Sequence, residues 1–145
     1  MVGQAVVDRK LTLLDTYVGY LEELATRPAS EFAGSFLVTG AARYYLQVAI
    51  ECCIDIGAHV LAADTARRAE DYRAVFRLLA EERVIGEDTA RAMDPAAALR
   101  NRLVHGYERV DDARVHAMLA GAATTFRAFA REIAAYLERD GHQPR

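Results

Sequence analysis

Two stretches near the ends of the chain carry apolar residues at helical spacing, and this pattern limits the fold most strongly. Successive apolar positions lie four and three residues apart, which places them on one face of an α-helix. The first stretch, over roughly residues 4–26, and the last, which begins near Asp111 or Asp112, show the pattern at Val7, Leu11, Leu14, Val18, Leu21 and Ala25 and at Val115, Leu119, Ala122, Phe126, Phe129, Ile133 and Leu137. Such narrow seams are typical of antiparallel helical bundles. The 145 residues include 28 alanines, 9 glycines and 3 prolines, which also favours an all-α chain, of about five helices.

The middle of the chain predicts a central helix over about residues 38–63. Apolar residues occupy nearly its whole circumference, which is the pattern of a helix surrounded by others. Before it, Arg27-Pro28 ends the first helix, and a loop is expected through Gly34 and Ser35. After it, residues 65–71 predict a charged loop. Residues 71–83 predict a third helix that Gly86 ends, with four side chains pointing inward: Tyr72, Val75, Phe76 and Leu79.

The segment that follows predicts two short helical pieces. The first covers residues 87–93. Asp94-Pro95 then begins a new helix, because aspartate is a good N-cap and proline suits the first helical position. This helix runs through residues 96–105, and Gly106 is placed to end it. The loops are short, so neighbouring helices are expected to be antiparallel within one domain over residues 1–140, followed by a frayed tail over residues 141–145.

Cysteine use and charge limit the surroundings in which the chain works. Cys52 and Cys53 are neighbours, which makes a bridge between them sterically poor, so a disulfide framework is excluded and a reducing cytoplasm is expected. Uncharged stretches are too short for a membrane span, and charges begin at Asp8, too early for a signal peptide. The net charge of −3 argues against a bulk nucleic-acid binder. A small local basic site stays open, since 17 of the 18 basic residues are arginines, although genome base composition explains the same bias.

Polar side chains interrupt the predicted central helix at every fourth position. Five of them form a slowly winding stripe: Arg43, Gln47, Glu51, Asp55 and His59. A solvated face or a ladder of i,i+4 pairs explains the outer members, Arg43 and His59. Glu51 and Asp55 are like charges one turn apart, which is unfavourable unless a cation lies nearby. We therefore expect an arginine from another element beside them, and we assign both carboxylates a supporting role.

The arginine expected there lies in the segment Arg100–Tyr107. Asn101 and His105 share a helix face, and the long side chain of Arg100 can fold back toward them. These groups suit a phosphate ester: arginine stabilises an anionic phosphorane, asparagine orients a hydroxyl, and histidine moves protons near neutral pH. Asn101 is the single asparagine of the chain and follows the arginine directly, which makes the cluster more specific than the arginine–histidine spacing alone. The simpler alternative is a helix end with a capping histidine and glycine.

The pattern Arg100-Asn101-x-x-x-His105-x-Tyr107 resembles the signature of HEPN-domain proteins, and specifically of the HepT toxin family. The resemblance covers nearly the whole chain. Within it, residues 46–59 are similar to the family's central helix, and residues 72–80 with 84–85 are similar to its third. It implies a helical-bundle homodimer that acts as a metal-independent ribonuclease and is paired with a minimal nucleotidyltransferase as antitoxin. Carried over, Arg100, Asn101 and His105 are the nuclease residues, and Tyr107 is the tyrosine to which the antitoxin attaches AMP. The resemblance implies neither a metal nor another cofactor.

Three further features are weaker. Asp94-Pro95 departs from the family pattern, in which a smoother apolar run precedes the motif. Asp55 and His59 have a spacing that metal ligands use, but such a lone pair is more often a surface hydrogen bond. Arginines within residues 67–83 could track an RNA backbone, yet neighbouring carboxylates nearly cancel their charge, which favours a solvated face.

Two functions are consistent with these patterns. The first is the toxin of a toxin–antitoxin system, an endoribonuclease in which the ribose 2′-OH attacks, His105 moves protons and Arg100 holds the phosphate. Two copies across a twofold axis make a fuller site than one. AMP on an exposed Tyr107 would lie beside Arg100 and Arg102 and silence the toxin, and we assign Arg102 a supporting role. In the alternative interpretation, the tyrosine packs against the last helix or stacks on a base. The second function is a non-catalytic HEPN module that binds a nucleotidyltransferase partner or a nucleotide, whereas a purely structural bundle explains the cluster poorly.

Overall fold

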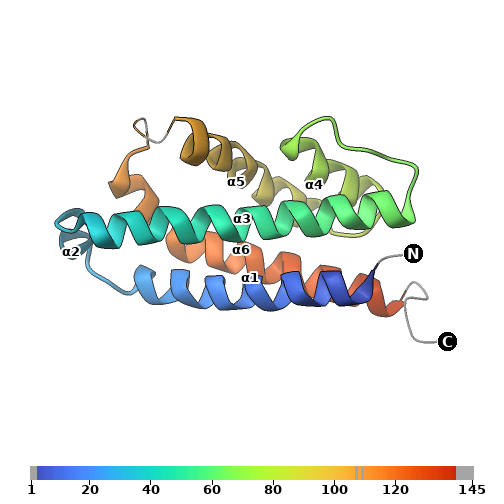
Figure 1. Cartoon of the computed structure of the whole chain (residues 1–145), viewed down its shortest axis with the longest axis horizontal. Helices are drawn as coiled ribbons and strands as arrows, with labels where there is room; N and C mark the ends of the chain where they lie inside the picture. The colour runs from blue at the N-terminus through green and yellow to red at the C-terminus, as the bar shows by residue number, and fades with distance from the viewer. Residues whose placement is uncertain (1–2, 107, 109, 140–145) are drawn as a thin grey trace.

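The residues that the structure describes fold into an antiparallel bundle of helices, as the sequence predicts. The computed structural model describes residues 3–106, 108 and 110–139, so the predicted tail at 141–145 lies outside the described residues. Within the described part of the chain there are six helices: α1 (Gln4–Ala25), α2 (Ala29–Ala33), α3 (Phe36–Asp64), α4 (Tyr72–Glu81), α5 (Glu87–His105) and α6 (Asp112–Arg139). α1 and α3 run antiparallel, as do α3 and α5, and α6 returns alongside α1 (Figure 1).

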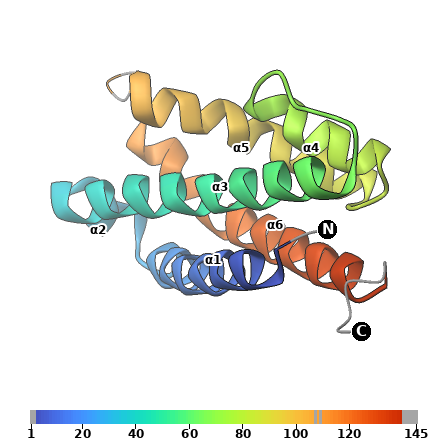
Figure 2. The ribbon, with the colours of Figure 1, turned by 45° about the vertical axis from the view of Figure 1, so that its right-hand side comes forward.

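α3 is the central helix, which confirms the prediction from its apolar circumference. It contacts each of the other five helices, and Figure 2 shows it between α5 and α4 on one side and α1 and α6 on the other. The statement that no stretch is apolar enough for a membrane span needs correction, because α3 is long and apolar enough by length and composition. In this fold 56% of its most apolar window is buried, as expected for the core helix of a bundle.

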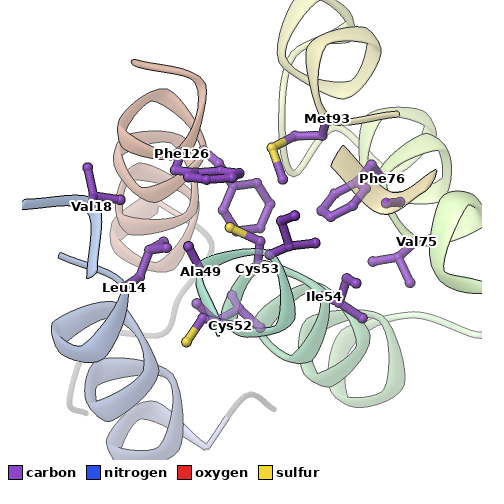
Figure 3. Packing of buried hydrophobic residues seen from close by; sticks show 14 of the residues in the cluster. Leu14, Val18, Ala49, Cys52, Cys53, Ile54, Val75, Phe76, Met93 and Phe126 are labelled. Atoms are coloured by element: carbon purple, nitrogen blue, oxygen red, sulfur yellow. The ribbon is translucent and has the colours of Figure 1, made fainter. Parts of the chain in front are cut away.

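The core is formed by the stripes that the sequence marks on the outer helices. Leu14 and Val18 of α1 and Phe126 of α6 meet the buried face of α3 around Ala49 and Cys53 (Figure 3). Of the predicted stripe positions, Leu11, Ala25 and Ala122 are partly buried and the others are buried. The two stripes therefore form seams against the central helix, which fixes how α1 and α6 approach it.

The predicted loop around residue 34 contains a short helix. α2 follows Pro28 and has Glu31 in its first turn, and its Phe32 is only 1% exposed. The Phe32 ring packs against the His116 ring of α6 at 5.0 Å between centroids. Ser35 then caps α3, accepting a hydrogen bond from the Val38 amide at 3.2 Å. A helix of one turn is too short to show a periodic apolar pattern in the sequence. The buried ring of Phe32 anchors α2 to the bundle.

The predicted helix break at Asp94-Pro95 is wrong, because α5 runs through both residues. Asp94 does not cap a helix: its two carboxylate oxygens accept hydrogen bonds from Arg73 of α4 at 2.9 and 2.6 Å. Proline inside a helix costs roughly 3 kcal/mol. Met93 and Ala97, on either side of the proline, are both fully buried. The free energy gained from their burial in the core offsets this cost.

Candidate active site

Three residues of the motif, Arg100, Asn101 and His105, lie in the last two turns of α5. Asn101, Arg102 and His105 are exposed, and Gly106 ends the helix as predicted, its amide donating to the Arg102 carbonyl at 2.9 Å. At 3.6 residues per turn, His105 lies between Asn101 and Arg102 around the helix, about 40° from one and 60° from the other. The three side chains therefore form one continuous polar face, open to solvent.

Arg100 lies on the opposite face of α5 and points into the bundle. It shares that face with Ala96, Ala97 and Leu103, which are buried or half-buried. Its Nε donates to Oε1 of Glu51 on α3 at 3.1 Å, its Nη2 forms an ion pair with the same oxygen at 3.0 Å, and its side chain is only 15% exposed. The prediction that an arginine from another element neutralises Glu51 is confirmed.

The ring of Tyr72 on α4 stacks against the same guanidinium. The Cζ of Arg100 lies 4.7 Å from the centroid of the Tyr72 ring, within the range of a cation–π interaction. The prediction that Tyr72 points inward is wrong, since the residue is 41% exposed. It is the first residue of α4, directly after Asp71, whose carboxylate caps the helix by accepting from the Ala74 amide at 2.8 Å. The ring therefore covers the guanidinium at the end of the helix rather than the core.

Three other members of the polar stripe on α3 have partners elsewhere in the chain. Asp55 accepts from Lys10 of α1 at 3.2 Å, so it faces α1 and is not brought to the motif. Arg43 binds Asp112 at 2.8 Å and the Val110 carbonyl at 2.7 Å, and His59 Nε2 accepts from the Gly3 amide at 3.1 Å. The stripe is thus a set of cross-links between helices, and Glu51 is the member that reaches α5.

The predicted nuclease residues do not form one connected polar cluster. Within the described residues no hydrogen bond or ion pair joins Arg100, Asn101 and His105, and Arg100 lies about 140° around α5 from His105. Tyr107 lies outside the described residues. One face of α5 therefore presents a histidine and an asparagine to solvent, while the other holds an arginine that is already hydrogen-bonded.

The described residues contain no group of three or more His, Cys, Asp or Glu side chains that could hold a metal ion. Cys52 and Cys53 are both free and buried. Burial raises the pKa of both thiols above the ordinary value, most strongly for Cys53. Neither thiol is therefore a nucleophile near neutral pH.

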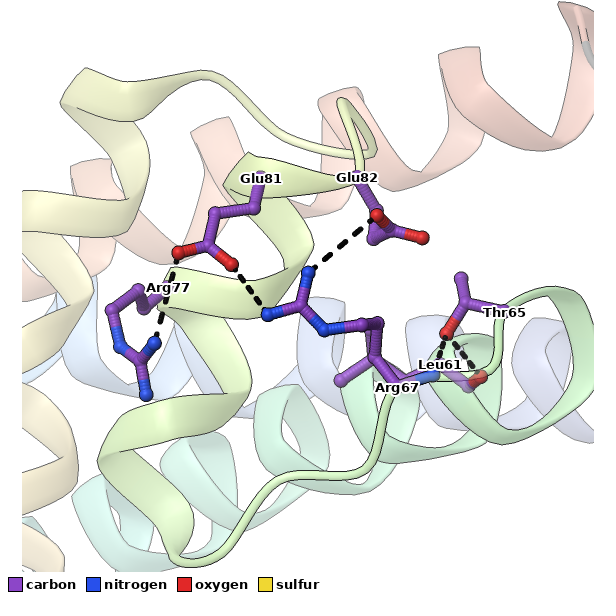
Figure 4. A network of polar contacts seen from close by, with 6 residues as sticks. All are labelled: Leu61, Thr65, Arg67, Arg77, Glu81 and Glu82. Atoms are coloured by element: carbon purple, nitrogen blue, oxygen red, sulfur yellow. Dashed lines mark hydrogen bonds and ion pairs between the residues drawn. The ribbon is translucent and has the colours of Figure 1, made fainter.

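Two of the arginines in residues 67–83, Arg67 and Arg77, form ion pairs with glutamates, in agreement with the solvated-face interpretation. Arg67 binds Glu81 at 2.7 Å and approaches Glu82 at 3.8 Å, and Arg77 approaches Glu81 at 3.7 Å (Figure 4). Arg67 is further fixed through its amide, which donates to the Thr65 hydroxyl at 3.0 Å. These ion pairs fasten the connection between α3 and α4 and neutralise part of the positive charge of this segment.

Comparisons with known proteins relate the chain to one family and to several solved structures. The profile of the family described as Ribonuclease HepT-like matches residues 14–133. A tRNA nuclease HepT from Aphanizomenon flos-aquae is 24% identical over 136 residues, which cover 94% of this chain and 92% of that protein.

Solved structures share the whole bundle. The cytosolic protein YutE of Bacillus subtilis, of unknown function, has a TM-score of 0.87 at 19% identity, covering 99% of this chain and 96% of that one. A tri-AMPylated HEPN toxin of Shewanella oneidensis in complex with MNT antitoxin has a TM-score of 0.82 at 22% identity, covering 90% and 97%. At these identities the structures establish the fold.

Proposed function

Because this chain belongs to the HepT-like ribonuclease family, we propose that it is the toxin of a toxin–antitoxin pair and a metal-independent endoribonuclease. The observation that carries the proposal is the exposed face of α5, where His105 and Asn101 stand side by side with no partner among the described residues. A histidine and an amide that are both free and solvent-facing are available to a substrate. The match to a ribonuclease family supports our assignment of an RNA-cleaving site to this face.

The chemistry we propose uses the 2′-OH of the RNA as the nucleophile. One imidazole removes the 2′-OH proton, the 2′ oxygen attacks phosphorus, and the bond to the 5′ oxygen breaks. The leaving 5′ oxygen receives a proton from an imidazolium, so the products are a 2′,3′-cyclic phosphate and a 5′-OH. Asn101 orients the attacking hydroxyl, and Arg100 stabilises the charge of the phosphorane.

Arg100 has donors left for this role. Glu51 accepts a hydrogen bond from Nε and pairs with Nη2 through the same oxygen, and a guanidinium carries five N–H groups. Glu51 and Tyr72 therefore hold the side chain in one orientation without saturating it. In this proposal Glu51 is a positioning residue, and the phosphate approaches the unused edge of the guanidinium.

We further propose that two copies form the active enzyme. Arg100 and His105 point to different sides of one α5, and a single exposed imidazole must otherwise serve as both base and acid. Two motif helices facing each other across a twofold axis supply a second histidine and asparagine to one cleft. Analytical ultracentrifugation tests this: a dimer at micromolar concentration is expected, and a fully active monomer contradicts it.

For regulation, we propose that a nucleotidyltransferase antitoxin attaches AMP to Tyr107 in the cytoplasm. The AMPylated HEPN toxin of similar fold supports this, and so does Arg102, which is exposed near the end of the motif helix and can pair with an added phosphate. Incubation with the cognate antitoxin and ATP should add the mass of AMP at Tyr107 and stop cleavage, whereas Tyr107→Phe should stay active. An unmodified Tyr107 in a fully neutralised toxin points instead to inhibition by binding.

The alternative, a non-catalytic HEPN module that binds a nucleotidyltransferase partner or a nucleotide, is favoured by one observation. Arg100 is largely buried and engaged by Glu51, which is the state of a structural residue. Expression in a host without the antitoxin separates the two functions. A nuclease toxin stops growth and His105→Ala restores it, whereas a binding module leaves growth unchanged in both.

A further inference from the structure

A groove between α3, α5 and α6 opens beside the motif face. Its volume is about 400 Å³, and it is lined by apolar side chains that include Ile50, Leu99 and Phe126, all nearly fully buried. Two arginines complete the lining, Arg102 near the end of α5 and Arg114 near the start of α6. These helix ends lie at the same end of the bundle (Figure 1). The groove thus has an apolar floor and an exposed cationic rim.

The charges on this rim are uncompensated. Within the described part of the chain, neither Arg102 nor Arg114 makes a hydrogen bond or an ion pair through its side chain, and no carboxylate lines the groove. Three other grooves on the molecule contain arginines together with aspartates or glutamates. On a chain of net charge −3, two free arginines beside an apolar groove complement an anionic ligand with an apolar part.

The groove is also adjacent to the proposed reacting group. Arg102 precedes His105 by three residues, and residues at this spacing are neighbours on a helix surface, with roughly 5–6 Å between their Cβ atoms. A ligand whose anion rests on Arg102 therefore lies next to the imidazole. An RNA strand has the required composition, since each nucleotide joins a phosphate to a base with two apolar faces.

We propose that this groove is a nucleotide subsite of the nuclease: an unpaired base of the RNA enters it, and Arg102 and Arg114 bind the phosphates on either side of that base. This inference rests on the proposed function and assigns Arg114 as a substrate-binding residue. The side chains offer one hydroxyl besides the arginines, that of Thr125, and its proton is already donated to the Gly121 carbonyl at 3.0 Å. Recognition there depends on stacking and shape, so the subsite should discriminate weakly among the four bases.

Binding of short single-stranded RNA tests the subsite directly. We would measure fluorescence anisotropy of a labelled oligonucleotide with the His105→Ala protein, which leaves the strand intact, and add Arg114→Ala or Arg102→Ala. Each arginine change should weaken binding by about tenfold and lower the slope of log Kd against log salt by about 0.7. Arg9→Ala is the matched control, because Arg9 is an exposed arginine of α1, outside the groove. It should bind within about twofold of its parent.

An abasic oligonucleotide of equal length separates the base from the phosphates. It keeps every charge, and it should bind the His105→Ala protein at least about tenfold more weakly, since stacking of one base contributes that much. Equal binding of the abasic strand, or an Arg114→Ala protein that behaves like Arg9→Ala, overturns the subsite even if wild type cleaves RNA. Loss of dimer mass in Arg114→Ala with unchanged RNA affinity also overturns it and assigns the groove to contact between copies. If wild type cleaves no RNA but binding still depends on Arg114 and on the bases, the subsite stands and the nuclease proposal fails.

Discussion

Removal of the Glu51 carboxylate should destabilise the bundle far more than removal of Asp55, one turn further along the same helix. Glu51→Ala leaves the Arg100 guanidinium, 15% exposed, without the acceptor of its Nε hydrogen bond and without its ion-pair partner. Exposed ion pairs contribute about 0.5 kcal/mol, whereas breaking a fully buried pair costs about 3–5 kcal/mol. Glu51 itself is 36% exposed, so we expect an intermediate loss of about 2 kcal/mol.

Asp55→Ala is the matched control. The Lys10–Asp55 pair has a similar distance, 3.2 Å, but its side chains are 38% and 55% exposed. Its loss should cost about 0.5 kcal/mol or less. Urea unfolding followed by circular dichroism at one fixed protein concentration measures both variants. For m values of about 2 kcal/mol per M, the midpoint should fall by about 1 M for Glu51→Ala and by less than about 0.3 M for Asp55→Ala.

The reasoning has a second, independent check, because the cost arises from the charge left unpaired on Arg100. Adding Arg100→Met to Glu51→Ala removes that charge and should recover about half of the lost free energy of unfolding. Equal losses for the two single variants would refute the argument. So would a double variant that is less stable than Glu51→Ala, since the guanidinium would then be stabilising without its carboxylate.

Three further predictions concern packing, pH and reactivity. Gly57→Ala should lower stability by about 1–3 kcal/mol in urea unfolding, because a Cβ there would lie 2.6 Å from a methyl group of α4, whereas Gly40→Ala on the same helix meets nothing within 4 Å and should gain about 0.5–1 kcal/mol. Hydrogen bonds from Arg127 lower the pKa of the Glu22 carboxyl, so this pair stabilises the fold above the unfolded pKa of glutamate and loses that effect as pH falls through the folded value. The melting-temperature difference between wild type and Arg127→Ala should therefore be present near neutral pH and shrink below about pH 4; a constant difference contradicts the linkage. The two buried cysteines should resist a thiol reagent such as DTNB at neutral pH and react after unfolding, and rapid reaction of the native protein would show that the core is open.

The long helices could be predicted from the sequence, because burial of one face produces a periodic apolar pattern. The same pattern shows which face packs against another helix. The seams of α1 and α6 and the central place of α3 follow from that alone. The Glu51–Arg100 pair could also be predicted, since two like charges one turn apart require a cation. Local rules failed where a partner on another helix overrode them: Asp94 binds Arg73 instead of capping, and α5 continues.

Two residues, Tyr72 and Arg114, could not be assigned to the proposed site from their spacing in the sequence. The position of Tyr72 relative to Val75 and Phe76 indicates an inward face, but only the fold shows that α4 begins at Tyr72, beside Arg100. Arg114 lies on a different helix from the motif, and sequence periodicity carries no information about which residues of two helices line a common groove. The cap at Asp71 was the signal available for Tyr72; none was available for Arg114.

Cleavage of a labelled tRNA by the purified chain in excess EDTA tests the central claim most directly, with His105→Ala as the comparison. The account predicts that wild type cuts the RNA with EDTA present and leaves 2′,3′-cyclic phosphate and 5′-OH ends. His105→Ala, with an unchanged helical circular dichroism spectrum, should be slower by at least about 100-fold. Wild-type cleavage that disappears in EDTA and returns with Mg²⁺, or a His105→Ala protein that cuts at the wild-type rate, would contradict it.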